Sequence, residues 1–240
     1  MKQKKTIQLC VLAAMLAGCS TATVEKDYTQ YVNPFIGTGG HGHTYPGAVL
    51  PNGMIHPSPD TRIYEWDACS GYYYADSTIN GFSHTHLSGT GCADLGDVLL
   101  MPTVGEQQIE RTADDTNKDR LPFASAFSHE KETATPGYYS VFLDRYGVKA
   151  ELTATQRAAL HRYTFPESAD AGFILDLDYS IQAQKNRSLS IEVVNDSTLC
   201  GYKNTNGWAW RHDVYFYAVF SKPFTCTVVQ DSVKGKDGRY

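Results

Sequence analysis

Side chains that could bind a polar ligand are concentrated in one stretch of the chain, residues 31–102. This stretch contains five of the eight histidines of the 240-residue sequence. Four of them form two His-x-His pairs, His41 with His43 and His84 with His86, and Trp66 and Asp67 lie between the pairs. Rigid aromatic and imidazole groups are typical of sites for polar ligands. These residue types predict a binding site without identifying the ligand.

The backbone that carries these side chains is predicted to be irregular. Residues 31–102 are rich in glycine and proline, which long helices do not tolerate. We therefore expect a set of loops, and binding residues are often found on loops that a rigid scaffold positions. If the segment around His84 and His86 is extended, the two rings share one face, because side chains alternate along a strand.

The N-terminus has the pattern of a bacterial export signal. Three lysines in residues 1–5 precede a short apolar run, and Leu16-Ala17-Gly18-Cys19 matches a lipobox. The expected organisation is a signal peptide over residues 1–18 and a lipid anchor at Cys19 with a polar spacer to Asp27. An ordinary signal peptide with a coincidental cysteine is the alternative. Periplasmic and cell-surface placement both remain open.

Charge and cysteine content restrict the class of protein further. The net charge is −5 and the basic residues form no cluster beyond the N-terminal lysines, so nucleic-acid binding is not expected. Four cysteines, Cys69, Cys92, Cys200 and Cys226, remain after Cys10 is assigned to the signal peptide and Cys19 to the lipid anchor. Their spacing fits no zinc finger, and export would permit a disulfide without requiring one.

The rest of the chain is predicted to be all-β. Short runs rich in Val, Ile, Phe, Tyr and Thr alternate with turn signals, which is typical of an antiparallel β-sandwich. Residues 111–120 are polar enough for an exposed loop. After the last run, residues 231–240 resemble a hairpin turn whose return strand is missing. The predicted strands are Tyr139–Leu143, Val148–Ala154, Gly172–Asp178, Leu189–Val194, Asp213–Phe220 and Thr225–Gln230.

Several of these motifs resemble a known family. The segments YVNPFIGTGG, HTYPGAVLP, SPDT, CSGY and GFSHTHLSGTG are similar to the N-terminal domain of glycoside hydrolase family 92, whose members are calcium-dependent, inverting exo-α-mannosidases. The likeness continues through residues 125–143, 150–166 and 215–224. It implies a family 92 β-sandwich over residues 28–240, of the supersandwich type and incomplete at its C-terminus.

The resemblance also implies a division of labour. In this family an (α/α)6 barrel follows the sandwich and supplies the general acid, the general base and most calcium ligands. The sandwich contributes loops to the mannose pocket. The expected partners are therefore mannose-containing glycans, the barrel domain and, through the lipid anchor, a membrane. We expect this chain alone to be inactive, because an inverting mechanism needs two suitably spaced carboxyl groups.

Each candidate site residue has a structural alternative. Trp66 either stacks on a sugar or lies in the core, and Asp67 either binds sugar hydroxyls or caps an Asx turn. His41, His43, His84 and His86 either face the pocket or are hydrogen-bonded structural groups. A four-histidine zinc site is chemically possible, but the resemblance implies a cation bound by oxygen ligands and no metal site in this chain.

Three functions remain compatible with the sequence. The first is the substrate-binding portion of an α-mannosidase that trims glycans. The second is a free-standing carbohydrate-binding lipoprotein without hydrolase activity. The third is a structural lipoprotein that has lost the site, against which the intact histidine and tryptophan motifs argue.

Overall fold

The computed structural model describes residues 26–110, 117–183 and 185–229. The chain divides into two compact units, residues 1–31 and 32–240. In the first, a short 3-10 helix, η1 (Thr29–Tyr31), follows an Asp27 carboxylate that accepts a hydrogen bond from the Thr29 backbone N–H. The expected signal peptide, Cys19 and the residue 231–240 turn lie outside the described residues. No helix within the described ranges is long and apolar enough to cross a membrane.

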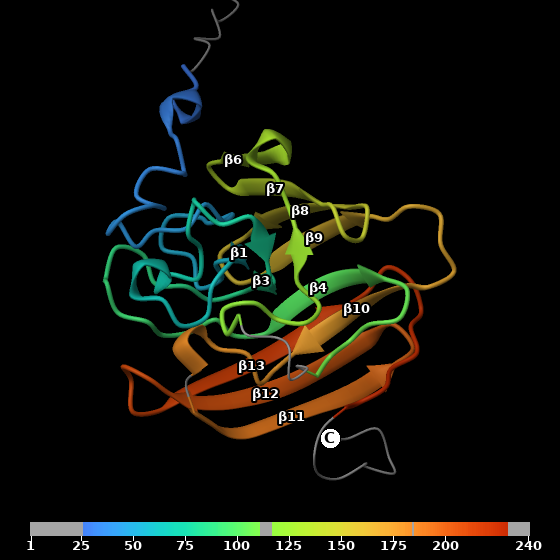
Figure 1. Ribbon diagram of the computed structural model, residues 1–240. Helices are drawn as coiled ribbons and strands as arrows, with labels where there is room; N and C mark the ends of the chain where they lie inside the picture. The colour runs from blue at the N-terminus through green and yellow to red at the C-terminus, as the bar shows by residue number, and fades with distance from the viewer. Residues whose placement is uncertain (1–25, 111–116, 184, 230–240) are drawn as a thin grey trace, which may run out of the picture. The chain divides into compact units, whose positions relative to one another are not determined.

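The second unit is built from antiparallel strands, as predicted. One sheet has the order β1 (Ser58–Asp60), β3 (Gly81–Ser83), β4 (Leu99–Val104) and β10 (Ala171–Asp176). Figure 1 shows this sheet between two others. They are the meander β6 (Glu132–Thr135), β7 (Tyr138–Leu143), β8 (Val148–Ala154) and β9 (Ala159–Thr164), and the sheet of β11 (Lys185–Asn195), β12 (Thr198–Asn206) and β13 (His212–Val219). β2 (Thr78–Ile79) and β5 (Ser125–Ala126) form a two-stranded pair.

Most predicted strands exist with shifted ends. Val148–Ala154 is β8 as predicted, and Leu189–Val194 lies within the longer β11. The prediction of a strand at Thr225–Gln230 is wrong, since residues 225–229 form no strand and residue 230 lies outside the described ranges. A β-favouring composition does not make a strand when no neighbouring backbone pairs with it. Of the loop expected at residues 111–120, only residues 117–120 are described, and they are irregular.

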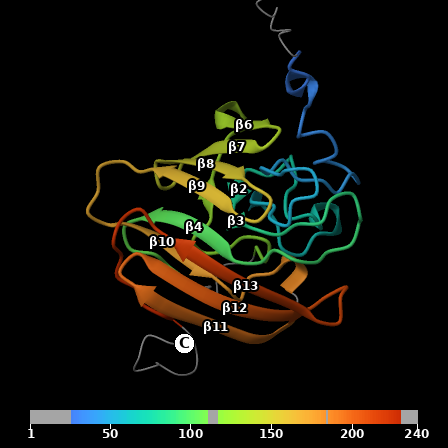
Figure 2. The same ribbon diagram turned by 180° about the vertical axis from the view of Figure 1, so that it is seen from behind.

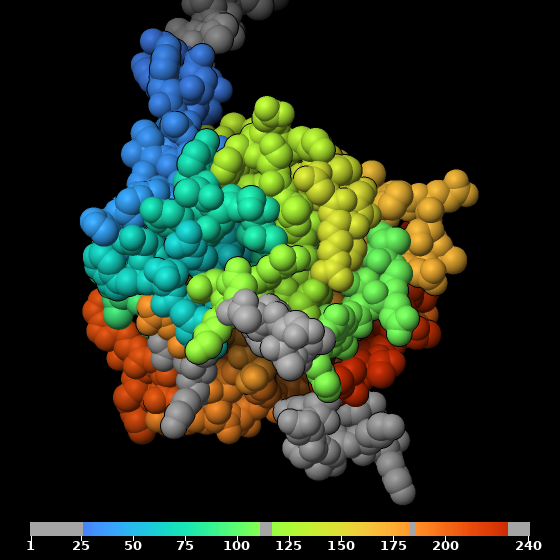
Figure 3. All heavy atoms as spheres, in the orientation of Figure 1, coloured from blue at the N-terminus to red at the C-terminus, as the bar shows by residue number. Residues whose placement is uncertain are grey.

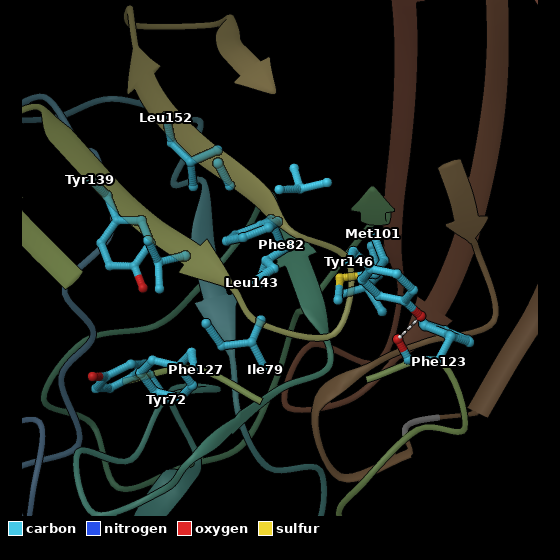
Figure 4. Packing of buried hydrophobic residues seen from close by; sticks show 14 of the residues in the cluster. Tyr72, Ile79, Phe82, Met101, Phe123, Phe127, Tyr139, Leu143, Tyr146 and Leu152 are labelled. Atoms are coloured by element: carbon cyan, nitrogen blue, oxygen red, sulfur yellow. Dashed lines mark hydrogen bonds between the residues drawn. The ribbon is translucent and has the colours of Figure 1, made fainter. Parts of the chain in front are cut away.

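The core lies where the meander packs against the loops and strands of residues 45–101. Phe82 on β3, Tyr139 on β7 and Leu152 on β8 are fully buried there (Figure 4). A ring contact of 6.2 Å between Phe82 and Tyr163 on β9 joins the middle sheet to the meander. The same cluster includes Tyr72 of the Cys-Ser-Gly-Tyr turn, so this core anchors the loop region directly.

One buried carboxylate organises the polar part of this core. Glu132 accepts hydrogen bonds from the hydroxyls of Tyr72 at 3.1 Å and Tyr139 at 2.6 Å, and its Oε2 lies 2.6 Å from His129 Nδ1. Its side chain has no exposed surface. Burial and the Glu132 charge raise the pKa of both tyrosines, so the phenols remain donors.

We expect Glu132→Ala to lower the free energy of unfolding by about 3 kcal/mol or more, because two buried phenol hydroxyls would lose their acceptor. Urea denaturation measures the change. Glu130→Ala, an exposed position two residues away, is the control and should cost less than about 0.5 kcal/mol. Equal effects of the two substitutions would show that the Glu132 network contributes little to stability.

Candidate functional site

Trp66 lies at the start of a one-turn 3-10 helix, η2 (Trp66–Ala68), in the loop after β1. Its side chain is on the surface, and the residue is 53% exposed. The indole is nevertheless fixed, because its Nε1–H donates a hydrogen bond of 2.9 Å to the carbonyl of Gly91. The surface position agrees with the ligand-contact interpretation of Trp66 and differs from the core alternative.

His43 supports the same indole from one side. Its ring meets Trp66 edge-on, with centroids 4.3 Å apart and planes at 71°. The backbone holds His43 at a φ of 54°, and its carbonyl accepts a hydrogen bond of 2.6 Å from the Gly89 N–H. Its Nε2 is buried without a hydrogen-bond partner among the described residues. An uncompensated imidazole nitrogen therefore lies beside the exposed tryptophan.

His41 and Asp67 form a polar pair next to Trp66. His41 Nδ1 lies 2.5 Å from Asp67 Oδ1, and the His41 ring centroid is 5.3 Å from that of Trp66. The His41 side chain is 76% exposed and that of Asp67 is 30% exposed. The Asp67 carboxylate thus binds a side chain from a distant loop, which differs from the local Asx-turn alternative.

The structure places His86 in the interior. Its Nε2 lies 2.9 Å from Asp60 Oδ1 and 3.0 Å from Ser83 Oγ, and its Nδ1 lies 2.7 Å from the His56 carbonyl. Neither the His86 nor the Asp60 side chain has exposed surface. This environment fits the alternative of a structural histidine, since both ring nitrogens are already hydrogen-bonded.

His84 has a different set of neighbours, so the two rings do not converge on one site. Its Nδ1 lies 2.7 Å from the Val98 carbonyl, and its ring stacks on His161 of β9 with centroids 4.8 Å apart and planes at 13°. His161 Nδ1 in turn lies 2.7 Å from the Tyr163 hydroxyl. The stack joins the loop after β3 to the meander.

Four of the six predicted residues are therefore gathered around one indole: His41, His43, Trp66 and Asp67. Sequence reasoning missed Gly91, which accepts the Trp66 hydrogen bond, and the Asp60, Ser83 and Gly71 groups that surround His86. Asp60 and Gly71 lie within the SPDT and CSGY motifs, but residue types alone did not indicate that they pack on each other.

The four cysteines within the described residues form no disulfide. Cys69, Cys92, Cys200 and Cys226 are all free. Burial raises the pKa of the Cys69 thiol, with a smaller contribution from Cys92. Within the described ranges no group of three or more His, Cys, Asp or Glu side chains is placed to hold a metal ion.

A polar hollow beside this region does not compete with it as a ligand site. Arg62 and Asp76 line the hollow and are paired with each other at 2.7 Å. The Asp119 carboxylate accepts hydrogen bonds from the backbone N–H groups of Ile63 and Tyr64. These charged groups already have hydrogen-bond and ion-pair partners within the protein.

Comparison with known proteins agrees with this fold. The fold is an antiparallel β-sandwich with polar and aromatic side chains gathered on its loops. The glycosyl hydrolase family 92 N-terminal domain matches residues 31–239, and the chain belongs to this family.

Solved structures support the assignment. The family GH92 α-mannosidase BT3965 from Bacteroides thetaiotaomicron is 41% identical over 90% of this chain, with a TM-score of 0.80. The family GH92 glycosyl hydrolase ccman5 is 32% identical over 80% of the chain, with a TM-score of 0.65. An uncharacterized secreted glycosidase of Arthroderma benhamiae is 32% identical over 181 residues, or 71% of this chain. The chain spans 29%, 26% and 22% of these three proteins, respectively.

We expect Gly71→Ala to be much more destabilising than Gly89→Ala. Both glycines have φ in the left-handed region, at +93° and +72°, so an added Cβ is strained at each. At Gly71 the Cβ would also lie 2.1 Å from Asp60 Oδ1, whereas at Gly89 it meets nothing within 4 Å. Thermal and urea unfolding should show a loss of about 3 kcal/mol against about 1 kcal/mol. Equal losses would mean that the Asp60 side chain can move away from the added Cβ at little cost.

The histidine stack predicts loss of stability in weak acid. Burial lowers the pKa of His84 and lowers that of His161 well below the usual 6.5, with the neighbouring imidazole adding to the effect at His161. The folded protein therefore binds fewer protons than the unfolded chain once the pH falls below about 6.5, and stability is lost. The free energy of unfolding should fall between pH 7.5 and 5.5, by up to about 1.4 kcal/mol per pH unit for each such proton.

Two variants separate this effect from general acid sensitivity. His161→Phe should reduce the dependence on pH, because one neutral imidazole is removed. His212→Gln should steepen it, because the hydrogen bond to Asp97 raises the pKa of His212 and so adds stability that is complete below about 6.5 and lost above it. If His161→Phe loses stability with falling pH as steeply as the parent protein does, the histidine stack is not the cause of the acid sensitivity.

Proposed function

We propose that this chain provides the substrate-binding N-terminal portion of an exported exo-α-mannosidase that trims glycans. In this proposal His41, His43, Trp66 and Asp67 form one wall of the pocket for a terminal α-linked mannose. The observation that carries the proposal is a surface indole fixed by Gly91 and His43 and placed beside an imidazole–carboxylate pair.

The chemistry of these groups fits a sugar. A hexose presents an apolar C–H face that can pack on the Trp66 ring and a rim of hydroxyls that need donors and acceptors. The exposed His41–Asp67 pair supplies both, and His43 Nε2 has unused hydrogen-bonding capacity. Because Trp66 is already fixed, little side-chain freedom would be lost on binding.

His84 and His86 have a supporting role in this proposal. His86 fixes the loop after β3 to Asp60 and the His56 backbone, and His84 fixes the same loop to β9. Their rings would keep the binding loops in place without touching the sugar.

The comparisons support the substrate class at the level of the family. One similar structure is described as an α-mannosidase in complex with mannoimidazole, and another, 28% identical, as an inverting mannosidase. Calcium, the general acid and the general base are proposed to belong to the length of these proteins that this chain does not match. Calcium would supply oxygen coordination of sugar hydroxyls there.

Export is part of the proposal. A similar protein is described as a secreted glycosidase, and the N-terminal lysines, apolar run and lipobox are those of an exported lipoprotein. Acylation at Cys19 would tether the chain to the bacterial envelope. The domain would then work beside the membrane on glycans outside the cytoplasm.

Titration of the chain with methyl α-mannoside tests the site. The three tryptophans give three indole N–H signals in a nitrogen-15 NMR spectrum, so binding at Trp66 can be seen even when it is weak. Trp66→Ala should weaken binding about tenfold or more, equivalent to about 1.4 kcal/mol. Its free energy of unfolding should fall by only about 1 kcal/mol, because the half-exposed side chain loses one hydrogen bond and one ring contact.

Two further variants sharpen the result. Trp66→Phe keeps an aromatic face but loses the bond to Gly91, and should have an intermediate affinity. Tyr217→Ala removes another exposed aromatic side chain, on β13, and should bind as the parent does. If Trp66→Ala unfolds much more readily and retains its affinity per folded molecule, the tryptophan is structural and the proposed site is wrong.

A further inference from the structure

All three tryptophans of the chain are exposed. Trp66 is 53% exposed, Trp208 67% and Trp210 76%. Tryptophan is highly buried on average in folded proteins. Trp208 and Trp210 lie in the connection between β12 and β13, residues 207–211, which we call the tryptophan hairpin. Two large indoles displayed at one tip indicate a contact surface.

The tryptophan hairpin is bound to the loop that holds Trp66. The Trp208 backbone N–H donates a hydrogen bond of 2.9 Å to Asp94 Oδ2, although the two residues are 114 positions apart. Packing is so close that a Cβ on Gly207 would lie 2.2 Å from Asp94 Oδ1. Asp94 is three residues from Gly91, the acceptor of the Trp66 indole, which limits the separation of those two anchor points to about 11 Å.

The figures show the same proximity. In Figures 1 and 2 the β12–β13 connection lies at the same side of the unit as the loops between β1 and β4. In Figure 3 the orange-red atoms of that connection lie directly below the blue-green atoms of those loops. The tryptophan hairpin and the Trp66 loop therefore form adjoining parts of one surface.

The base of the tryptophan hairpin is bound to a buried carboxylate, Asp97. His212, the first residue of β13, lies 3.0 Å from Asp97 Oδ2 through its Nε2. The buried Lys203 of β12 lies 3.3 Å from the other oxygen of Asp97, and Thr85 donates to the same carboxylate at 2.6 Å. Burial alone would raise the pKa of Asp97. The hydrogen bond from His212 and the charge of Lys203 instead lower this pKa to about 2, so the Asp97 carboxylate stays ionised at neutral pH.

Polar groups around the two indoles favour a carbohydrate as the ligand. The Arg187 guanidinium lies 5.6 Å from the centre of the Trp210 ring, and Arg211 is paired with Asp213 at 2.5 Å. Aromatic faces with hydrogen-bonding groups at their edges suit a neutral, hydroxylated chain. Indoles also occur at membrane interfaces, but Asp94, Asp213 and the net charge of −5 disfavour an anionic lipid surface.

We propose that the tryptophan hairpin is a distal subsite that binds sugar units beyond the terminal mannose held at Trp66. This inference rests on the proposed function, because it extends the same site toward the leaving-group side of the glycan. It assigns Trp208 and Trp210 as residues that select longer oligosaccharides over single sugars.

The test compares a single sugar with a longer one on the chain. Methyl α-mannoside and a linear α-linked mannopentaose are titrated while the three indole N–H signals are followed by NMR. The monosaccharide should shift the Trp66 signal alone, and the pentasaccharide should shift all three signals and bind about tenfold more tightly. Trp208→Ala and Trp210→Ala should each weaken pentasaccharide binding several-fold. Both variants should bind the monosaccharide as tightly as the parent does.

Asp94→Ala and Tyr217→Ala complete the series. Asp94→Ala frees the hairpin from the Trp66 loop, so the pentasaccharide advantage should shrink although both indoles remain. Tyr217→Ala, with an aromatic of similar exposure elsewhere on β13, should behave as the parent does.

The possible failures are distinct. If Trp66→Ala weakens both sugars and the hairpin variants bind the pentasaccharide as the parent does, the subsite is refuted and the proposed function stands. If neither sugar shifts any indole signal, both are refuted. If the hairpin signals respond to phosphatidylglycerol vesicles and not to the pentasaccharide, the hairpin is a lipid-binding element and the subsite is refuted.

Discussion

The buried carboxylate of Asp60 is the group on which the loop region depends. It accepts hydrogen bonds from the Ser83 backbone N–H at 3.1 Å, and its other oxygen lies 2.9 Å from His86. Gly71 packs against it so closely that no side chain fits between them. A carboxylate removed from water is stable only when its oxygens are hydrogen-bonded. One residue thus connects β1, β3 and the turn that follows Trp66. The position of the Trp66 loop therefore depends on the Asp60 contacts.

Two other buried carboxylates repeat this principle at the edges of the loop region. Glu132 joins the meander to Tyr72, and Asp97 joins the loop after β3 to β12 and β13. Loops without regular secondary structure must satisfy their polar groups by other means. Here acidic side chains provide the acceptors, so a region with only two- and three-residue strands can display Trp66 in a fixed orientation. Such networks are sensitive to the loss of one member, since the remaining groups are left buried and unpaired.

The sequence predicted the parts of the structure that follow from local pattern. The all-β class, the loop character of residues 31–102 and β8 are confirmed, because alternation and turn residues determine them. The short strands β1 and β3 carry no such pattern and exist through Asp60 and His86. The pairing of strands into four sheets also depends on contacts far apart in sequence. Thr225–Gln230 shows the opposite error, a β-rich composition without a paired neighbour in residues 225–229.

Site residues were predictable by type and less so by role. The His41–His43 pair and Trp66–Asp67 meet as a cluster, whereas His84 and His86 have the same spacing and lie in buried hydrogen-bonding networks. Spacing cannot distinguish these outcomes, because a histidine that binds ligand and one that supports a loop differ only in what surrounds them. Trp208 and Trp210 are the converse case. Their sequence context is an unremarkable hairpin, and only the bond from the Trp208 backbone to Asp94 places them beside Trp66. Exposed indoles are costly to keep in water, and these two lie in a connection that is hydrogen-bonded to the segment carrying Gly91, the acceptor of the Trp66 indole; this is the physical basis for proposing one ligand that contacts all three.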